Sequence, residues 1–397
     1  MKIKDTYDVI VVGGGPAGSM AAWEIAKCGV SVCVLEKDNM IGPPVRCGEA
    51  TSESGLKKFV KIKDSWIAEK ITGAKLGSPS GKLVDLDFRA ETGNGYILNR
   101  KLFDSDLSKY ASNEGAEIYT GAYVKDVLKD NNNFVNGVIL DYKGEKKYIQ
   151  SKILIGADGC SSRIGRWAGI RTQVKMKDME SAVQYYVSDI DIEPNKMIMY
   201  VGSNHAPGGY LWVFPKGKNT ANIGIGISGK YSKNQSAKKL LDQFMYREYP
   251  NAKIHDTTCG GVPCGKPMRN PVRDGIMLVG DAAHQINPMT GGGILSGMTA
   301  GWIAGQVAVE AVNNYNYSKE MLNNYSDRMW KSFGKNYTRF YNIRSAIDNL
   351  TDDDFEKIAD KVLSIPIHKR KLSSVFKAAV FKKPTLVIDV IKVFAGV

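Results

Sequence analysis

A glycine-rich turn near the N-terminus constrains the fold more than any other feature of this chain. Residues 13–18 read Gly-Gly-Gly-Pro-Ala-Gly and fit the pattern G-x-G-x-x-G. A β-branched run over 7–12 precedes the turn, and a helical pattern over 16–27 follows it. Glycines in such a turn allow close approach of a pyrophosphate, which then faces the N-terminus of the helix. The pattern predicts a dinucleotide-binding βαβ unit. Its candidate contact residues are Gly13, Gly15, Ala17 and Gly18.

An acidic residue indicates which dinucleotide the turn would hold. A second strand is expected over 31–36, and it ends at Glu36. A carboxylate at this point accepts hydrogen bonds from an unphosphorylated ribose, which favours FAD or NAD. A glycine turn without a ligand is the alternative interpretation, but the strand, helix and acid together favour a cofactor site.

Three later motifs distinguish between these cofactors. Gly-Ala-Asp-Gly at 156–159 and Gly-Asp-Ala-Ala-His at 280–284 each follow an expected strand, and Arg100 lies where a helix is expected to open. Together with the glycine turn, these motifs resemble the para-hydroxybenzoate-hydroxylase-like flavoprotein superfamily. The resemblance implies FAD as the cofactor. It places in the cofactor site Arg100, Asp158, Gly280 and Asp281.

The same resemblance implies that the segment 288–293 meets the flavin ring. This segment reads Pro-Met-Thr-Gly-Gly-Gly and opens a helix expected over about 292–312. The positive end of that helix dipole would stabilise an anionic reduced flavin. The residues assigned to this contact are Pro288, Gly291, Gly292, Gly293 and Ile294.

The order of the patterns predicts a discontinuous domain. The chain has 397 residues, which favours two or three domains. Residues 181–228 alternate as in an antiparallel sheet with one open face, and the pattern after about residue 314 is helical and basic. We therefore expect an α/β fold: a discontinuous Rossmann-like FAD-binding domain, an inserted antiparallel-sheet catalytic domain and a C-terminal helical region. The expected ranges are 1–70, 96–175 and 265–313 for the first, 71–95 and 176–264 for the second, and 314–397 for the third.

Net charge and hydropathy limit the kinds of partner that this protein is expected to bind. The formal net charge is +13, which suits nucleic acid, an acidic membrane surface or an anionic substrate. No nucleic-acid-binding motif accompanies the lysines, so no nucleic acid is expected. No stretch reaches the ~18 apolar residues of a membrane span, and no signal-peptide pattern is present. A cytoplasmic protein is expected, with peripheral contact at the inner face of the membrane as a further hypothesis.

The six cysteines give no sign of a metal or a disulfide framework. They form no paired C-x-x-C sets, so neither a zinc site nor a set of disulfides is expected. Cys259 and Cys264 are close in sequence, but two reduced thiols are the expected state for this pair.

Two further motifs are similar to those of the geranylgeranyl reductase family, which includes the archaeal digeranylgeranylglycerophospholipid reductases. They are Pro-Val-Arg-Cys-Gly-Glu at 44–49, and Tyr-Leu-Trp-Val-Phe-Pro at 210–215 followed by Gly-Ile-Gly at 224–226. The resemblance extends from the first strand to about residue 310. It implies FAD-dependent saturation of isoprenoid double bonds in membrane lipid precursors. It also implies flavin contacts by Arg46, Cys47, Gly48 and Ala50, and adenine-side contacts by Ala122 and Val124.

An alternating aromatic strand fits that chemistry. Tyr210, Trp212 and Phe214 share one face of the expected strand. Such a face is often plain core, but the motif context favours the wall of an apolar tunnel for a polyprenyl ether lipid. An isolated alkene has no carbonyl to polarise, so we expect a proton to reach its less substituted carbon while hydride reaches the tertiary carbon. Aromatic faces stabilise the developing charge by ~0.5–2 kcal/mol each. The catalytic candidates are Cys47, Tyr210, Trp212 and Phe214.

The sequence identifies neither the proton donor nor the electron donor of this reaction. Cys47 is a candidate acid by position, but a packing role beside the flavin is equally compatible. His205 and His284 are expected to be turn or surface residues. No second dinucleotide turn is visible, so an external electron donor is expected: reduced ferredoxin, a deazaflavin or NADPH. Alternative functions on the same fold are an oxygen-using aromatic hydroxylase, a flavin-dependent isoprenoid cyclase and a quinone-linked electron-transfer flavoprotein.

The last residues predict one more helix. After Pro384 the polar residues Thr385, Asp389 and Lys392 form a narrow stripe at helical spacing. A helix packed on the protein and a helix lying in the membrane interface both fit this pattern. The first is the plainer interpretation, and lysines nearby support the second. They are Lys371, Lys377, Lys382 and Lys383.

Overall fold

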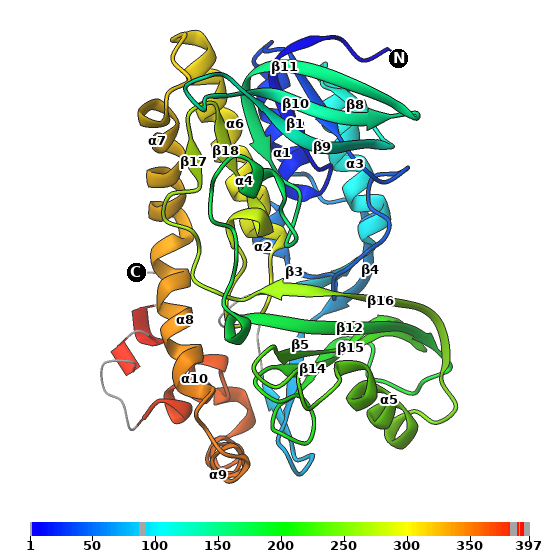
Figure 1. Cartoon of the computed structure of the whole chain (residues 1–397). Coiled ribbons are helices and arrows are strands. Elements are labelled where there is room, and N and C mark those ends of the chain that lie inside the picture. Colours follow the sequence, from blue (N-terminus) through cyan, green and yellow to red (C-terminus); the bar gives the residue numbers. More distant parts are fainter. Residues whose placement is uncertain (1, 87–92, 382–386, 389, 393–397) are drawn as a thin grey trace.

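An eight-stranded sheet forms the upper part of the computed structural model in Figure 1. The structure describes residues 2–86, 93–381, 387, 388 and 390–392. The parallel strands of this sheet are β1 (Thr6–Val12), β2 (Val32–Leu35), β8 (Glu117–Tyr119), β11 (Glu145–Gly156) and β18 (Ile276–Leu278). Antiparallel strands complete it: β9 (Ala122–Lys129), β10 (Val135–Tyr142) and β17 (Val272–Arg273). The strands expected near 7–12, 31–36, 152–157 and 276–279 are confirmed.

Both faces of this sheet are covered, which is why its strands read as nearly continuous apolar runs. Val9 and Val11 pack into the same core as Ile303 of α6 (Ile294–Asn313). Ile10 belongs to the core on the opposite face. The helices around this sheet are α1 (Pro16–Lys27), α3 (Arg100–Asn113), α4 (Ile164–Trp167), α6 (Ile294–Asn313) and α7 (Lys319–Met329).

Small residues bring α1 and α6 unusually close together. A Cβ added to Gly301 would lie 2.0 Å from the backbone oxygen of Ala17, and one added to Gly305 would lie 2.8 Å from Cβ of Glu24. Any larger residue at these two positions would separate the helices. Both helices begin at the same end of the parallel sheet, so this contact sets the spacing between their N-termini.

A seven-stranded sheet lies below the first in Figure 1. Its strands, in spatial order, are β16 (Lys253–Pro263), β12 (Met179–Ser188), β15 (Thr220–Ser228), β14 (Tyr210–Gly217), β13 (Lys196–Tyr200), β5 (Gly73–Gly77) and β6 (Leu83–Leu86). α5 (Ala237–Glu248) covers one face, where Leu211 and Val213 pack against Leu241. The sheet is antiparallel except for one parallel pair, β13 with β5.

A three-stranded sheet connects the two larger ones. It consists of β3 (Ala50–Ser52), β7 (Gly95–Leu98) and β4 (Ile67–Ile71). β4 and β7 span the expected domain boundaries at residues 70 and 95, which stay predictions. Short elements beside this sheet are α2 (Glu53–Leu56) and the 3₁₀ turn Asp64–Trp66. The 3₁₀ turn Met176–Asp178 precedes β12, and the 3₁₀ turn Gly280–Ala283 contacts α6.

The C-terminal region is helical and joins the two large sheets. α7, a π-helical turn (Trp330–Gly334) and α8 (Lys335–Ile347) run along one side of the molecule in Figure 1. The 3₁₀ turn Ile367–Lys369 separates α9 (Asp352–Leu363) from α10 (Leu372–Ala379), at the lower end. Within the described ranges, the structure holds no helix that is both long and apolar enough to span a bilayer.

Most of the helix expected after Pro384 lies outside the described residues. Of this segment, only 387, 388 and 390–392 are described. Val390 is buried in a small cluster with Ile343 of α8, whereas Ile388 and Ile391 are about half exposed, at 52% and 48%. One side of these few residues therefore packs on the protein.

Candidate functional site

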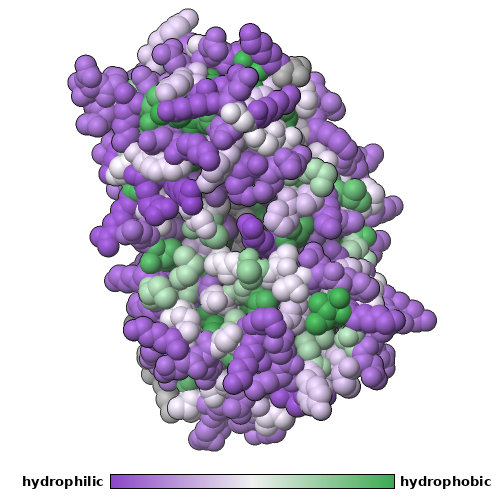
Figure 2. Space-filling view, turned by 45° about the vertical axis from the view of Figure 1, so that its right-hand side comes forward, coloured by the Kyte–Doolittle hydropathy of each residue, from purple (hydrophilic) through white to green (hydrophobic). Residues whose placement is uncertain are grey.

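One cavity of about 1260 Å³ joins the carboxyl ends of the parallel strands to the open face of the seven-stranded sheet. Figure 2 shows a band of apolar and weakly polar residues across the middle of the molecule, between hydrophilic ends. α8, α9 and α10 also contribute to the cavity lining. Cofactor motifs from four distant parts of the sequence meet here, together with the aromatic strand.

The glycine turn forms a cradle at one end of this cavity. A Cβ on Gly13 would lie 2.3 Å from the backbone oxygen of Ala157, and one on Gly18 would lie 1.9 Å from that of Gly13. These two glycines permit tight packing. A Cβ on Gly15 would meet nothing within 4 Å, so Gly15 borders open space at the N-terminus of α1. Gly18 itself does not line the cavity. The arrangement suits a pyrophosphate.

Two carboxylates complete the cradle. Glu36 accepts hydrogen bonds from the backbone N–H groups of Gly14 and Asp38, at 2.8 and 2.9 Å, and lines the cavity beside the turn. Oδ2 of Asp158 accepts from the backbone of Arg163 at 2.7 Å. Its Oδ1 is buried with no partner, and burial raises the pKa of this carboxyl. An unpaired buried acceptor fits a hydroxyl donor such as those of the sugar and ribityl parts of FAD.

The start of α6 supplies the other half of the cofactor site. Gly291 adopts the left-handed conformation (φ 67°), and α6 begins after Gly293 without a side-chain cap. Its free N–H groups and positive dipole end therefore belong to the cavity. A Cβ on Gly293 would lie 3.1 Å from Oδ1 of Asp281, and burial raises the pKa of the Asp281 carboxyl. Pro288 does not line the cavity. Its carbonyl instead accepts from Arg344 at 3.0 Å.

The remaining predicted cofactor residues line the same cavity. They are Arg46, Cys47, Gly48, Ala50, Arg100, Ala122, Val124, Gly280, Gly292 and Ile294. Arg100 forms two hydrogen bonds to Asp104, of 2.9 and 2.5 Å, which fix its guanidinium beside Cys47. The cradle, the unpaired acceptor and the uncapped helix together fit FAD.

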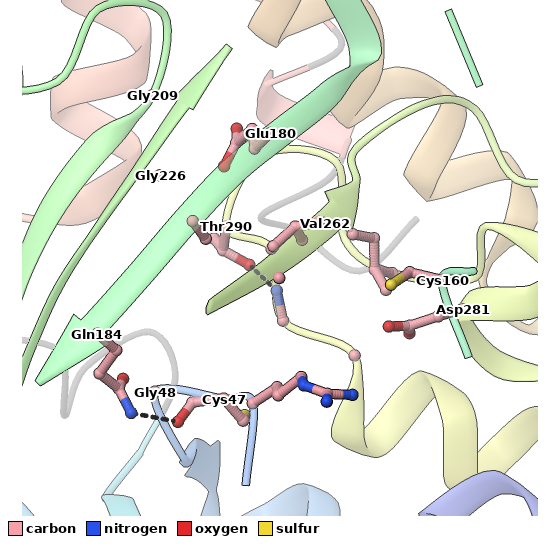
Figure 3. A pocket seen from close by; sticks show the side chains of 18 of the residues that line it. Cys47, Gly48, Cys160, Glu180, Gln184, Gly209, Gly226, Val262, Asp281 and Thr290 are labelled. Carbon is pink, nitrogen blue, oxygen red and sulfur yellow. Dashed lines mark hydrogen bonds between the residues drawn. The ribbon is translucent and has the colours of Figure 1, made fainter. Parts of the chain in front are cut away.

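The Cys47 segment lies between the cofactor end and the aromatic strand. The Cys47 carbonyl accepts a hydrogen bond of 3.0 Å from Nε2 of Gln184, drawn as a dashed line in Figure 3. A Cβ on Gly48 would lie 2.8 Å from the Phe214 ring. Burial raises the pKa of the Cys47 thiol, and the Arg100 guanidinium only partly offsets this. The thiol is therefore the neutral, protonated form at neutral pH.

The aromatic side chains of β14 share one face, as predicted. The ring centroids of Tyr210 and Trp212 are 5.7 Å apart, and those of Trp212 and Phe214 are 6.2 Å apart. All three side chains line the cavity. The Tyr210 hydroxyl donates to the Thr290 carbonyl at 2.5 Å, so this face reaches the flavin segment. Their catalytic roles stay predictions.

Gln184 and Glu49 hold this arrangement together, and neither was identified from the sequence as a site residue. Oε1 of Gln184 accepts from Nε1 of Trp212 at 3.0 Å while its amide donates to Cys47. Glu49 accepts from the Arg100 backbone at 2.9 Å. It also accepts from side chains of the seven-stranded sheet, namely Lys216 and Asn222. The Cys47 segment is thus fixed from both sides.

A buried ion pair was also missed. Nη2 of Arg344 on α8 lies 2.7 Å from Oε1 of Glu180 on β12, and less than a tenth of either side chain is exposed. Arg344 also donates to the backbone carbonyls of Gly208, Cys264 and Pro288. Burial raises the pKa of Glu180, and Arg344 opposes this effect. The only signal in the sequence is a charged residue inside an otherwise alternating strand.

The far end of the cavity is apolar. The seven-stranded sheet contributes Leu76, Val84, Met197 and Met199; α9 contributes Phe355, Ile358 and Val362; and α10 contributes Leu372, Val375 and Phe376. A large cavity with such an apolar lining suits a long hydrocarbon chain.

The structure also places the two histidines and the six cysteines. His205 and His284 both lie in turns, and neither lines the cavity. His284 is held by a hydrogen bond of 2.9 Å to the Thr172 carbonyl. All six cysteines are free, with Cys259 exposed and Cys264 buried.

Comparison with known proteins agrees with this geometry. Residues 178–262 match the geranylgeranyl reductase catalytic domain, and residues 8–55 match the FAD dependent oxidoreductase family. A digeranylgeranylglycerophospholipid reductase of Methanosarcina acetivorans is 39% identical, covering 95% of this chain and 93% of its own length. Digeranylgeranylglycerophospholipid reductase 2 of Methanococcoides burtonii is 38% identical over 100% of this chain and 97% of its own.

Solved structures give the same result. A geranylgeranyl bacteriochlorophyll reductase-like protein from Thermoplasma acidophilum superimposes with a TM-score of 0.91 at 35% identity, over 98% of this chain and 99% of the other. The p-nitrophenol 4-monooxygenase of Pseudomonas putida shares the fold alone, with a TM-score of 0.72 at 19% identity over 97% of this chain and 99% of the other. The chain therefore belongs to the digeranylgeranylglycerophospholipid reductase family of FAD-dependent oxidoreductases.

Proposed function

We propose that this protein saturates the isolated double bonds of geranylgeranyl chains in digeranylgeranylglycerophospholipids, a step of archaeal membrane lipid synthesis. The observation that carries the proposal is the continuity of one cavity. It joins the FAD cradle to an apolar arm walled by the seven-stranded sheet, α9 and α10. A polyprenyl chain in that arm would present its double bonds to the cofactor end.

The residues between the two ends supply what an alkene reduction needs. Reduced FAD, when bound, supplies the hydride. The neighbouring rings of Tyr210, Trp212 and Phe214 stabilise positive charge that develops on the tertiary carbon. Cys47, as a neutral thiol beside this face, donates the proton to the neighbouring carbon. The apolar arm excludes water that would otherwise capture the cationic carbon.

Two partners complete the proposal. The lipid substrate resides in a bilayer, so peripheral contact with the membrane surface brings the cavity to its substrate. Electrons come from an external donor, for which reduced ferredoxin, a deazaflavin and NADPH are the candidates. The described residues hold a single glycine-rich nucleotide cradle, which is assigned here to FAD.

The direct test is anaerobic incubation of the reduced protein with unsaturated archaeal ether lipids, followed by mass spectrometry. Each saturated bond adds two hydrogens to the lipid. An unchanged product mass with rearranged carbons would indicate a cyclase, and substrate-coupled oxygen consumption would indicate a hydroxylase. Rapid quinone reduction with no lipid product would indicate electron transfer. Any of these results would overturn the proposal.

Trp212→Ala tests the aromatic face. The substitution removes both ring contacts and the hydrogen bond to Gln184, none of which belongs to the FAD cradle. We expect kcat/KM for polyprenyl lipid to fall by up to about 30-fold, since one aromatic face contributes up to about 2 kcal/mol, with FAD content unchanged. Parallel loss of flavin and activity would instead identify Trp212 as a residue of the fold.

A further inference from the structure

The end of the chain that walls the apolar arm is also its most uniformly basic segment. Between Asp360 and Asp389 the sequence contains seven Lys and Arg residues and no Asp or Glu. The inner side of this segment lines the cavity through α10. Its outer side is exposed. We define the basic C-terminal face by the exposed residues Lys361, Ile367, Lys369, Lys371, Lys377 and Phe381.

Large apolar side chains stand among these lysines. Ile367 is 58% exposed and Phe381 is 57% exposed. Arg370 fixes the turn that presents Ile367, because its guanidinium donates to the backbone carbonyls of Leu363 and Ile365, each at 2.8 Å. The apolar residue is therefore presented by a braced turn. Exposed apolar side chains flanked by lysines are typical of surfaces that enter the headgroup region of a bilayer.

A shallow groove connects this face with the cavity wall. It has a volume of about 380 Å³ and lies between α9, α10 and Val387. Its floor is apolar, and its polar groups are Lys361, Lys377 and Ser374. Nζ of Lys361 lies 4.9 Å from the centre of the Phe381 ring. Val362 lines both the groove and the large cavity, so the two are separated at that point by a single side chain.

We propose that the basic C-terminal face docks the protein on an anionic lipid surface, with Ile367 and Phe381 in the headgroup layer and the lysines on lipid phosphates. This proposal rests on the proposed function, because only an enzyme that acts on membrane lipid needs to dock on a membrane. The position of the docking face is inferred from charge complementarity and from Val362, which lines both the groove and the cavity. Docking here places the bilayer against the helices that wall the apolar arm.

The test compares two triple variants of equal charge in the full-length FAD-bound protein. K369Q/K371Q/K377Q removes three lysines from the basic C-terminal face. K125Q/K143Q/K146Q removes three exposed lysines from β9, from the turn between β10 and β11, and from β11, at the opposite end of the molecule in Figure 1. Binding is measured by flotation with vesicles of phosphatidylglycerol and phosphatidylcholine, and with vesicles of phosphatidylcholine alone. Each lysine near an anionic leaflet raises the partition of a protein to the vesicles by about fivefold.

We expect the first variant to lose about 100-fold in partitioning to the anionic vesicles, and the second to lose less than about threefold. Equal losses would show only the general attraction of a basic protein, and would overturn the proposal. So would a wild type that binds both vesicle types equally. I367S/F381S adds a second measurement: it should release the protein from anionic vesicles at high salt, where the apolar contact remains. Retained binding of this variant under those conditions would remove the apolar part of the proposal.

An activity assay separates this proposal from the proposed function. Lipid dispersed in detergent needs no docking, so K369Q/K371Q/K377Q should reduce it at the wild-type rate while slowing on lipid in anionic vesicles. Equal rates on both substrates would exclude a docking role for these lysines. If the wild type fails to reduce detergent-dispersed lipid, the proposed function fails, and the flotation result still decides the docking.

Discussion

The two ends of the large cavity are built in different ways. The cofactor end is built mainly from backbone, namely glycine turns and two helix N-termini. The carboxylates at this end are held in place by main-chain N–H groups. The apolar end consists of side chains from β5, β6, β13, α9 and α10. Backbone geometry either fits a phosphate or does not, whereas a wall of many side chains changes by degrees. We therefore expect a substitution at the cofactor end to abolish FAD binding altogether. Substitutions away from that end should change activity or stability by degrees.

The largest effect is expected at Gly15. Gly15→Val places a branched side chain in the open space of the cradle, where the pyrophosphate would lie. The purified variant should be colourless, with FAD below detection by absorbance. Its fold should survive, because the new side chain meets no protein atom near Cβ. Gly15→Ala should retain weakened FAD binding. A Val variant that keeps stoichiometric flavin would remove the assignment of the cradle.

The buried ion pair comes next. Arg344→Met leaves Glu180 buried without its cation, together with three carbonyls that lose a donor. This should lower the free energy of unfolding by about 3–5 kcal/mol in urea denaturation. Arg328→Met is the control, because its pair with Glu310 is about 40% exposed on both sides and should cost less than about 1 kcal/mol. Adding Glu180→Gln to Arg344→Met should restore part of the loss. Equal costs for the two single variants would contradict the importance of burial here.

A substitution of Cys47 tests the region of the cavity between its cofactor end and its apolar end. Cys47→Ala should slow the oxidation of reduced flavin by lipid by about 100-fold or more, while dithionite reduces the flavin at the wild-type rate. Cys28→Ala, an exposed cysteine, is the matched control. Unchanged single-turnover kinetics in Cys47→Ala would leave this residue a packing role.

The same thiol predicts a pH profile. Only the protonated thiol donates, and burial raises its pKa. Lipid reduction should therefore stay constant through about pH 8.5, where an exposed thiol titrates, and fall only at higher pH. A decline centred near the ordinary thiol value would contradict both the raised pKa and the role as acid.

The smallest effect is expected at Gln184. Gln184→Leu removes the hydrogen bonds to Cys47 and Trp212, each worth about 1 kcal/mol. We expect kcat for lipid reduction to fall about 10-fold, with KM and FAD content nearly unchanged. Gln184→Glu keeps the acceptor for Trp212 but loses the donor to Cys47. Its kcat should therefore lie between that of Gln184→Leu and that of the wild type. Identical values for Leu and Glu would mean that only the Cys47 contact matters.

The motifs of the cofactor end could be found in the sequence because that end is encoded in short segments, and the structure gathers them in one cavity; their contacts with FAD stay predictions. The glycine turn, Asp158 and the 280–294 segment each carry their geometry in adjacent residues, and their meeting follows from parallel strands ending at one edge. Two assignments were less accurate in detail: Gly18 packs against the turn, and Pro288 faces Arg344.

The contacts between distant segments could not be predicted in this way. Gln184 and Cys47 are 137 residues apart in sequence, and Glu180 reaches Arg344 from a different region of the chain. Nothing in the segment around Gln184 or Arg344 indicates which distant residue it contacts. The parallel pairing of β13 with β5 was missed for the same reason. Periodicity identifies a strand and its buried face, but the partner of a strand depends on the whole fold.

The strand order of the upper sheet has a consequence for synthesis of the protein. β1 carries the cradle and pairs with the nearby β2. Its other partner, β11, lies far along the chain, with Thr6 opposite Gln150, and β18 adds Ile276 opposite Leu154. The segment that opens α6 follows later still. Pairings between such distant segments form slowly. On the ribosome, the sheet around the N-terminal glycine turn therefore stays incomplete until most of the chain has emerged. Cofactor capture becomes a late event, and a chaperone that shields β1 in the interval would raise the yield of folded protein.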